Sequence, residues 1–474
     1  MTMHKTDPAA ADATRRLAEF ASALQFERLP SDVVAKAKTS ILDTLGCCLF
    51  GATLASVRRL AAMVSEDIGD GPSQVLGLPQ RTSPSHAALV NGTSAHAFQL
   101  DEIHIGATLH PGATSVPAVL ALAEAGRYSG RDAITAVVAG AEIGIRVGMA
   151  CKGGMFTRGY HNQGTTGALV AGAAAGRLLG LDAGRMRHAL GIAGSQAAGL
   201  MAVQEGAMAK GFHSGRAAQS GVYAARLAAL DYTGIPDVLE APYGGFMSTL
   251  VGDYAGAELA AELGTRWDIL SVGYKPAPAS NGSITAMSAI DRIMRDHALE
   301  ADDIREVTAY VSTNTLHHCG WHYDPAQVQG VLAAQMNLCY GMAVMALRRK
   351  ATADEFNEQT MRDPAVLDFI RRVRVALEPR YDASGGKLRV ACRAVVVTRD
   401  GRTLEVEVLY RKGTPEDPMT HAELDRKFVE LACKTIGVQA AREIAGAVAE
   451  LERMESTETL TRMLSEAVRA HARQ

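Results

Sequence analysis

The chain has 474 residues and a formal net charge of −3, and its composition is 47% hydrophobic and 21% charged. Such a chain can bury the cores of two or three domains. Basic and acidic residues are mixed along it and aromatic residues make up only 5%, which argues against a nucleic-acid partner. The seven irregularly spaced cysteines suit reduced thiols in the cytoplasm. We expect neither a secretory signal nor a membrane span.

The first part of the chain, residues 11–270, has apolar residues at helical spacing and is rich in Ala, Gly and Leu. The segment 32–52 is an example, since its pattern ends on Gly51. Similar patterns cover residues 112–130, 131–150, 164–182, 186–202 and 214–230. Because small residues let helices approach closely, we expect a tightly packed and largely buried helical bundle.

The pattern changes near Lys275, where "PAPASNG" is typical of a break between domains. The segments that follow alternate in hydropathy and are rich in β-branched residues, which predicts strands. Strands are expected at 304–315, 371–379, 387–401 and 402–413, with a hairpin at "RDG", and helices at 283–298, 326–348 and 363–371. The sequence thus predicts a mostly α protein: a large all-helical domain from residues 1–272 and 413–474, and a smaller α+β domain at 273–412.

The most informative stretch is 91–117, which holds His96, Asp101, Glu102, His104 and His110 within fifteen positions. Functional loops often have this character, although an irregular surface loop remains an alternative. A metal site is a second alternative, but the spacing matches no compact zinc pattern and HExxH is absent. "DEIH" resembles a helicase box, which the lack of a GxxxxGK[ST] loop excludes.

Two further stretches carry candidate binding residues. His161 lies in a Gly/Thr-rich segment that opens a helix, where backbone N–H groups favour a carboxylate. Lys210, His213 and Arg216 recur at every third position, so they fall near one helix face and suit an anionic small molecule. The alternatives are a capping loop with an incidental histidine and a solvated basic face.

Lys275 is the last candidate, because ligand sites favour the junctions between domains; a solvent-exposed lysine is its alternative. Another cluster, at 316–325, has a Cys-x-x-His but no second pair of ligands. We interpret that cluster as a loop after a strand. The sequence also lacks GxGxxG after a strand, GxSxG and CxxC. Acid–base chemistry without a metal or an organic cofactor is the simplest enzymatic interpretation.

Together these stretches resemble the MmgE/PrpD family over nearly the whole chain. The motifs that carry the resemblance are "LDTLGCCLFGA", "NGTSAHAFQLDEIH", "LHPGATSVPAVLALAEA", "GYHNQGTTGALVAGAAAGRLLGL", "ALGIAGSQAAGL", "KGFHSGRAAQSGVYAARLA" and "GYKPAPAS". The family includes 2-methylcitrate dehydratase, cis-aconitate decarboxylase and an iminodisuccinate epimerase. The resemblance implies a helical domain built from both ends of the chain, a smaller α+β lid, a homodimer and no metal or organic cofactor.

The resemblance also implies which residues act. The candidate catalytic residues are Asp101, His110, His161, Lys210 and Lys275, and the candidate substrate-binding residues are Gln99, His104, His213, Arg216 and Ser280. The family's usual "LDFDD" is "FQLDE" here, so Gln99 stands where decarboxylase-like members use an acid. The usual "KPYPCCRYTH" reads "KPAPASNGSI" here.

We therefore expect a lyase acting on a small di- or tricarboxylate. Lys210, Lys275 and Arg216 are expected to bind carboxylates. His110, His161 or Asp101 would remove a proton next to a carboxylate, and the nearby cations would stabilise the charge that develops. We expect dehydration, the family's commonest activity. Epimerisation, decarboxylation and a non-catalytic carboxylate-binding role remain open.

Overall fold

The computed structural model describes residues 7–326 and 330–473 and divides into two compact units. Within the described residues, unit 1 takes in the chain up to Ala202, Met208–Val272 and the chain from His421 onward. Unit 2 consists of Val203–Ala207 and Gly273–Thr420. The chain therefore returns to the first unit at His421, next to Thr420, where the helical sequence pattern resumes, although the expected domain boundary was drawn at residue 413.

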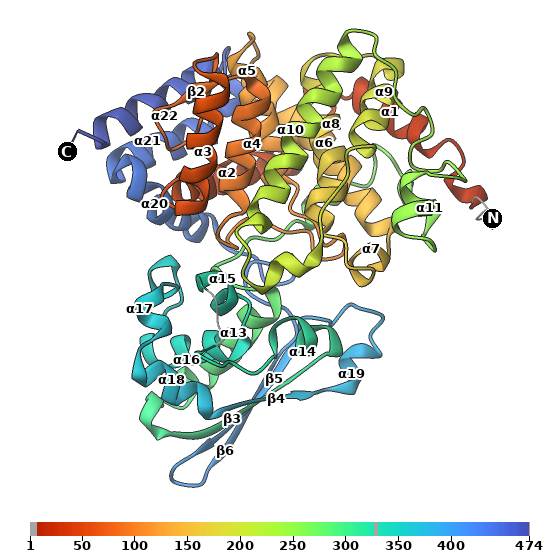
Figure 1. Cartoon of the computed structure of the whole chain (residues 1–474). Coiled ribbons are helices and arrows are strands. Elements are labelled where there is room, and N and C mark those ends of the chain that lie inside the picture. The colour runs from red at the N-terminus through yellow and green to blue at the C-terminus, as the bar shows by residue number, and fades with distance from the viewer. Residues whose placement is uncertain (1–6, 327–329, 474) are drawn as a thin grey trace. The chain divides into compact units, whose positions relative to one another are not determined.

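Unit 1 is built from helices and one two-stranded hairpin (Figure 1). Its N-terminal and middle segments form α1 (Ala13–Ala23), α2 (Ser31–Gly51), α3 (Ala55–Ile68), α4 (Pro84–His96), α5 (Gly112–Glu124), α6 (Gly130–Ala150), α7 (Gly154–Thr157), α8 (Asn162–Leu178), α9 (Ala183–Gly194), α10 (Ala209–Ala229), α11 (Phe246–Leu250) and α12 (Gly256–Leu259). The C-terminal segment adds α20 (His421–Ile436), α21 (Val438–Ala449) and α22 (Glu458–His471). The hairpin pairs β1 (Ser73–Gln74) with β2 (Arg81–Thr82).

Helix α6 is the most apolar long helix of unit 1. Ser129 begins it with a capping box, in which the Ser129 hydroxyl accepts from the Asp132 N–H and the Asp132 carboxylate accepts from the Ser129 N–H. By length and composition α6 could cross a membrane, and so could the bent pair α2 and α3 taken together. However, 94% of the apolar window of α6 is buried inside the unit. Burial all round is what a central core helix requires.

Helix α10 carries three candidate residues, Lys210, His213 and Arg216, and its glycines set how closely it packs. A Cβ at Gly215 would lie 2.1 Å from the carbonyl oxygen of Leu89 on α4. A Cβ at Gly221 would lie 2.3 Å from the Cβ of Ala171 on α8. Neither position tolerates a side chain, because atoms cannot approach this closely. The small residues therefore bring α10 against both helices, as expected from the sequence.

Unit 2 contains a four-stranded sheet in the order β4-β3-β5-β6. The strands are β3 (Ile304–Val311), β4 (Val373–Leu377), β5 (Cys392–Thr398) and β6 (Thr403–Val408). β3 pairs parallel with β4 and antiparallel with β5, and β5 and β6 form the expected antiparallel hairpin. The helices are α13 (Asn281–Asp296), α14 (Thr313–Cys319), α15 (Gly330–Gln335), α16 (Leu338–Arg348), α17 (Glu358–Met361), α18 (Pro364–Arg371) and α19 (Pro379–Asp382). In Figure 1, α13, α16 and α18 lie on one side of this sheet, in keeping with the alternating burial along β5.

Several expectations for unit 2 need correction. The strand expected at 402–413 ends at Val408, and the loop expected at 316–325 begins within α14, which runs to Cys319. The strand expected at 304–315 ends at Val311, because the Ser312 hydroxyl accepts from the Thr315 N–H and starts α14. The strand expected at 387–401 is confined to Cys392–Thr398. The helix expected at 326–348 is interrupted, since the Asn337 side chain caps α16, and its residues 327–329 lie outside the described residues.

Candidate active site

Four of the expected site residues come together within unit 1. Asp101 and His110 lie on the loop between α4 and α5, His161 is the N-cap residue of α8, and Lys210 lies in the first turn of α10. His96, the last residue of α4, lies among them, with its ring centroid 4.7 Å from that of His110 and 5.5 Å from that of His161. The cluster therefore joins sequence segments more than a hundred residues apart.

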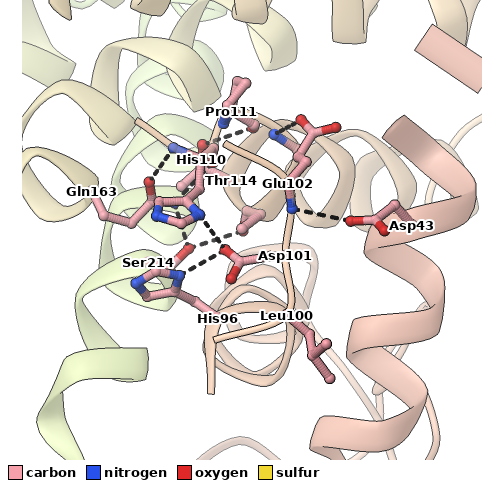
Figure 2. A network of polar contacts seen from close by, with 12 residues as sticks. Asp43, His96, Leu100, Asp101, Glu102, His110, Pro111, Thr114, Gln163 and Ser214 are labelled. Atoms are coloured by element: carbon pink, nitrogen blue, oxygen red, sulfur yellow. Dashed lines mark hydrogen bonds and ion pairs between the residues drawn. The ribbon is translucent and has the colours of Figure 1, made fainter. Parts of the chain in front are cut away.

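The centre of the cluster is the Asp101 carboxylate, which faces two histidine rings. Its Oδ2 lies 2.7 Å from Nδ1 of His96 and 3.0 Å from Nδ1 of His110, as Figure 2 shows. Although burial alone would raise the pKa of Asp101, His110 and His96 together hold it well below its ordinary value. Asp101 therefore stays ionised and fixes both rings through their Nδ1 atoms.

His96 has both ring nitrogens engaged. Its Nδ1 donates to Asp101, and its Nε2 lies 3.2 Å from the Lys210 ammonium, which can only donate. These contacts assign a neutral ring with its proton on Nδ1. Burial first, and then the Lys210 charge, lower the pKa of His96 to about 3. His96 thus connects Asp101 to Lys210 and does not exchange protons with a substrate.

Because His96 is neutral in the folded protein, we predict that its contribution to the free energy of unfolding decreases at acid pH. The folded-state pKa lies below the ordinary value of 6.5, so the unfolded chain binds the extra proton as the pH falls below that value. The free energy of unfolding of the wild type relative to His96→Gln should therefore fall by about 1.4 kcal/mol per pH unit below pH ~6.5. Urea unfolding of both proteins between pH ~7.5 and ~5 measures this difference.

The comparison with His96→Gln removes opposing contributions from other buried groups. Burial raises the pKa of Glu102 and of Glu142 to about 7 in each case, and these carboxyls stabilise the fold as the pH falls. Both residues are present in the two proteins, so their effects cancel. If the two stability curves run parallel over this range, His96 already carries its proton in the folded state.

His110 is held by its backbone as well as by Asp101. The Gln163 side chain accepts from the His110 N–H and donates to the His110 carbonyl, at 3.0 Å in both cases. The Glu102 carboxylate accepts from the N–H of Gly112, two residues further on, at 2.8 Å. Because Nδ1 faces Asp101, Nε2 is the atom with which His110 can exchange a proton. This is the arrangement of an imidazole oriented by a carboxylate for general acid–base catalysis.

His161 and His213 form a second histidine contact, with 2.9 Å between their Nδ1 atoms. One ring donates and the other accepts at this distance, so they cannot both be positively charged. Burial and then the Lys210 charge lower the pKa of both rings, and that of His161 well below its ordinary value. Two neutral imidazoles next to an ammonium suit the recognition of an anion by hydrogen bonds.

The remaining sequence candidates are placed differently. Arg216, expected on the same face of α10, is exposed and donates to the Gln219 side chain. His104 is buried, and its Nδ1 accepts from the Ala107 N–H, which stabilises the loop that returns to His110. Gln99 is buried in a left-handed conformation with φ of 60°, and its Nε2 has no hydrogen-bond acceptor in the described part of the chain.

Lys275 and Ser280 belong to unit 2. Lys275 is almost completely buried. This contradicts the alternative of a solvent-exposed lysine and is compatible with the expected role as a site residue. The Ser280 hydroxyl caps α13 by accepting from the Ser283 N–H. Its Oγ also lies 2.8 Å from Oγ of Ser283, so its expected contact with the substrate would compete with this second hydrogen bond.

The donor atoms of His96, Asp101 and His110 lie within 4.8 Å of one another, close enough to consider a metal ion. The same atoms already form a hydrogen bond between His96 and Asp101 and a 3.0 Å ion-pair contact between His110 and Asp101, and the Lys210 ammonium contacts the far side of His96. A divalent cation would meet the repulsion of this ammonium. The donor set therefore fits a proton-relay cluster better than a metal centre.

Sequence reasoning missed the structural supports of the cluster. His96 was recognised only as one of the polar residues in its stretch, although its position five residues before Asp101 was a usable signal. Asp43 is another support, because its carboxylate accepts from the Glu102 N–H at 3.0 Å. Its single charge within the apolar run "SILDTLGCC" indicated a buried carboxylate with a partner. No local signal identified Gln163, because its partners, His110 and Ser214, come from two distant segments.

Comparison with known proteins identifies the family. A family model described as the MmgE/PrpD N-terminal domain matches residues 15–257, and the MmgE/PrpD C-terminal domain matches residues 278–453. The chain belongs to the MmgE/PrpD family. The resemblance inferred from the sequence motifs is thereby confirmed.

Curated relatives cover nearly the whole chain. A cis-aconitate decarboxylase of Aspergillus terreus is 30% identical over 98% of both chains. A cis-aconitate decarboxylase-like protein of Aspergillus oryzae is 29% identical, covering 95% of this chain and 97% of its own length. The human cis-aconitate decarboxylase is 29% identical, with 93% of this chain and 92% of its own length covered. At the level of the family, these relatives support a lyase-type enzyme for small carboxylates.

Proposed function

We propose that this MmgE/PrpD chain is a cofactor-independent decarboxylase of a small tricarboxylate of the cis-aconitate type. The observation that carries the proposal is the Asp101–His110 pair beside the Lys210 ammonium, on a chain similar over its full length to cis-aconitate decarboxylases. The preference for dehydration drawn from the family's commonest activity gives way to this reaction, because the curated relatives described above carry decarboxylase names.

In the proposed reaction, one carboxylate leaves as CO2 and the electrons of the broken C–C bond form a new double bond. The old double bond opens, and its far carbon takes a proton. Nε2 of His110 would deliver this proton, since His96 has both nitrogens occupied and the pKa of His161 is strongly lowered. Lys210 would hold a remaining carboxylate and limit the build-up of negative charge. Lys275 stays a candidate for a second carboxylate.

Proton NMR of the enzyme with cis-aconitate, citrate, 2-methylcitrate and substituted succinates in D2O tests the proposal. Loss of CO2 with deuterium at one carbon of a new olefinic product supports it. An olefin formed with loss of water and without CO2 would identify a dehydratase instead. Deuterium at a stereocentre without a new product would identify an epimerase. A panel left unchanged would contradict all three.

Dehydration of a hydroxy acid such as a 2-methylcitrate is the second candidate. Gln99 favours it, because an uncharged amide replaces the acid that decarboxylase-like relatives are expected to use. The same His110 could remove a proton next to a carboxylate, provided that a second group protonates the departing hydroxyl. The NMR panel separates the two candidates by the presence or absence of CO2.

Lys210 is predicted to provide binding energy for a substrate carboxylate. Lys210→Met should raise KM by about 10- to 100-fold, because a hydrogen bond to a charged group contributes about 1.5–3 kcal/mol. Arg226→Met is the matched control, since it removes a positive charge from an exposed position on the same helix. Equal KM values for wild type and Lys210→Met would remove Lys210 from the substrate contacts.

Two wider expectations remain proposals. We propose a homodimer, which light scattering coupled to gel filtration tests directly. A cytoplasmic location is proposed from the composition and the reduced cysteines, of which the described residues bury all except Cys433. Neither proposal affects the chemistry assigned to the Asp101–His110 pair.

A further inference from the structure

Behind the Asp101 carboxylate lies a second buried ion pair, between Lys427 on α20 and Asp43 on α2. Nζ of Lys427 lies 2.5 Å from Oδ1 of Asp43, and both side chains are buried in unit 1. A buried pair of this kind costs much desolvation, so replacing it with apolar residues is often neutral for stability. Stability alone therefore does not account for it.

Each partner of the pair also bonds to the main chain next to Asp101. Nζ of Lys427 donates to the carbonyl of Leu100 at 2.7 Å, and Oδ2 of Asp43 accepts from the N–H of Glu102 at 3.0 Å. The two bonds hold the backbone immediately before and after Asp101. Figure 2 shows the second of them, from the Glu102 N–H to Asp43. The Lys427–Asp43 bond joins these two hydrogen bonds, so a shift of either side chain would disturb both contacts with the backbone.

The same set of hydrogen bonds reaches the backbone near His110. Glu102, whose N–H is held by Asp43, accepts with its own side chain from the N–H of Gly112. The same buried network thus holds the backbone next to Asp101 and the backbone next to His110. The 3.0 Å contact between these two side chains is therefore fixed from both partners. A shift of about 1 Å in catalytic groups is enough to lower a rate by roughly 10²-fold.

We propose that Lys427 and Asp43 are positioning residues, which fix the Asp101–His110 pair through the backbone of Leu100 and Glu102. The C-terminal segment thereby completes the active site without touching the substrate. The inference rests on the proposed function for its kinetic test only, because the geometry of the Asp101–His110 contact can be measured without turnover.

The test compares wild type with Lys427→Met, which keeps the length of the side chain and removes its charge. We expect kcat to fall by about 10- to 100-fold while KM changes little. The low-field Nδ1–H resonances of the histidines, recorded in ¹⁵N-histidine-labelled protein, should shift or broaden, because the Asp101 carboxylate moves. Asp43→Asn should change the same resonances and provides a second variant if Lys427→Met does not fold.

Arg146→Met is the matched control for loss of a buried ion pair in the same unit. Arg146 contacts Glu142 and Asp268 and donates to the carbonyls of Ala261 and Arg266, far along the chain from the Asp101 loop. It should lower Tm and leave kcat and the resonances unchanged. The proposal is overturned if Lys427→Met keeps the wild-type resonances. It is also overturned if Arg146→Met lowers kcat as much as Lys427→Met does when the two variants lose the same amount of Tm. An inactive wild type would overturn the proposed function and leave the resonance test intact.

Discussion

His110→Gln should lower kcat by about 10³-fold or more, with little change in the affinity for the substrate. General acid–base catalysis contributes about 10²–10⁴-fold to a rate, and glutamine cannot carry the proton at the position of Nε2. The measurement pairs turnover, followed by NMR, with the dissociation constant of the substrate or its product from calorimetry. His421→Gln, at an exposed position of α20, is the control for replacing a histidine.

A His110→Gln enzyme with nearly wild-type kcat would show that another group carries the proton. A group other than His161 would then have to be sought, because the strongly lowered pKa of His161 leaves that ring neutral and without a proton to deliver. Loss of binding together with kcat would instead place His110 among the residues that hold the substrate in its ground state.

Asp101→Asn is expected to lower kcat by about 10⁴-fold, an effect of the size seen when a catalytic histidine loses its orienting carboxylate. One carboxylate oxygen, Oδ2, faces Nδ1 of both His96 and His110. An asparagine offers a single acceptor atom and an amide that donates, so one of the two rings must change its tautomer. Either His96 loses its contact with Lys210, or His110 presents the wrong form of Nε2.

The stability of Asp101→Asn supplies an independent check. The folded-state pKa of Asp101 lies well below its ordinary value of 3.8, so its ionised form stabilises the fold above that pH. The wild type should therefore be the more stable protein from pH ~5 to ~8, and the difference should shrink as the pH falls below ~4. Asp268→Asn, which affects another buried aspartate of unit 1, should keep kcat. A near-wild-type kcat for the Asp101→Asn enzyme would contradict the role of Asp101 in orienting His110.

The sequence was sufficient for much of the fold because the evidence there is local. Alanine and glycine at helical spacing predicted the bundle, and the β-branched alternation predicted β3, β4, β5 and β6 in their observed order, with expected ends that extend beyond the observed strands. Local patterns failed where a side chain ends an element. Ser312 and Asn337 each start a new helix by capping, which interrupted the strand and the helix expected at those positions.

The site was predictable only in part, because helical periodicity does not say which residues of a helix are buried by other elements. Lys210 and Arg216 share a helix face within the sequence pattern, yet Lys210 is buried against His96 and Arg216 is exposed. The role of His96 depends on partners at positions 101 and 210, and that of Lys427 on partners at positions 43 and 100. Pairings of this range are set by tertiary packing, which one sequence does not encode in any local pattern.

The division of unit 1 between two ends of the chain has a consequence for its synthesis. Phe428, Ala432 and Ile436 of α20 belong to the same apolar core as Leu45 and Leu49 of α2. The ribosome makes all of unit 2 before it makes α20, so the nascent chain carries the uncovered side of α2 throughout that interval. Helix α20 then covers this side of α2 and, through Lys427, holds the backbone next to Asp101. If Lys427 positions Asp101 as proposed above, a chain can become catalytic only after α20 has been made.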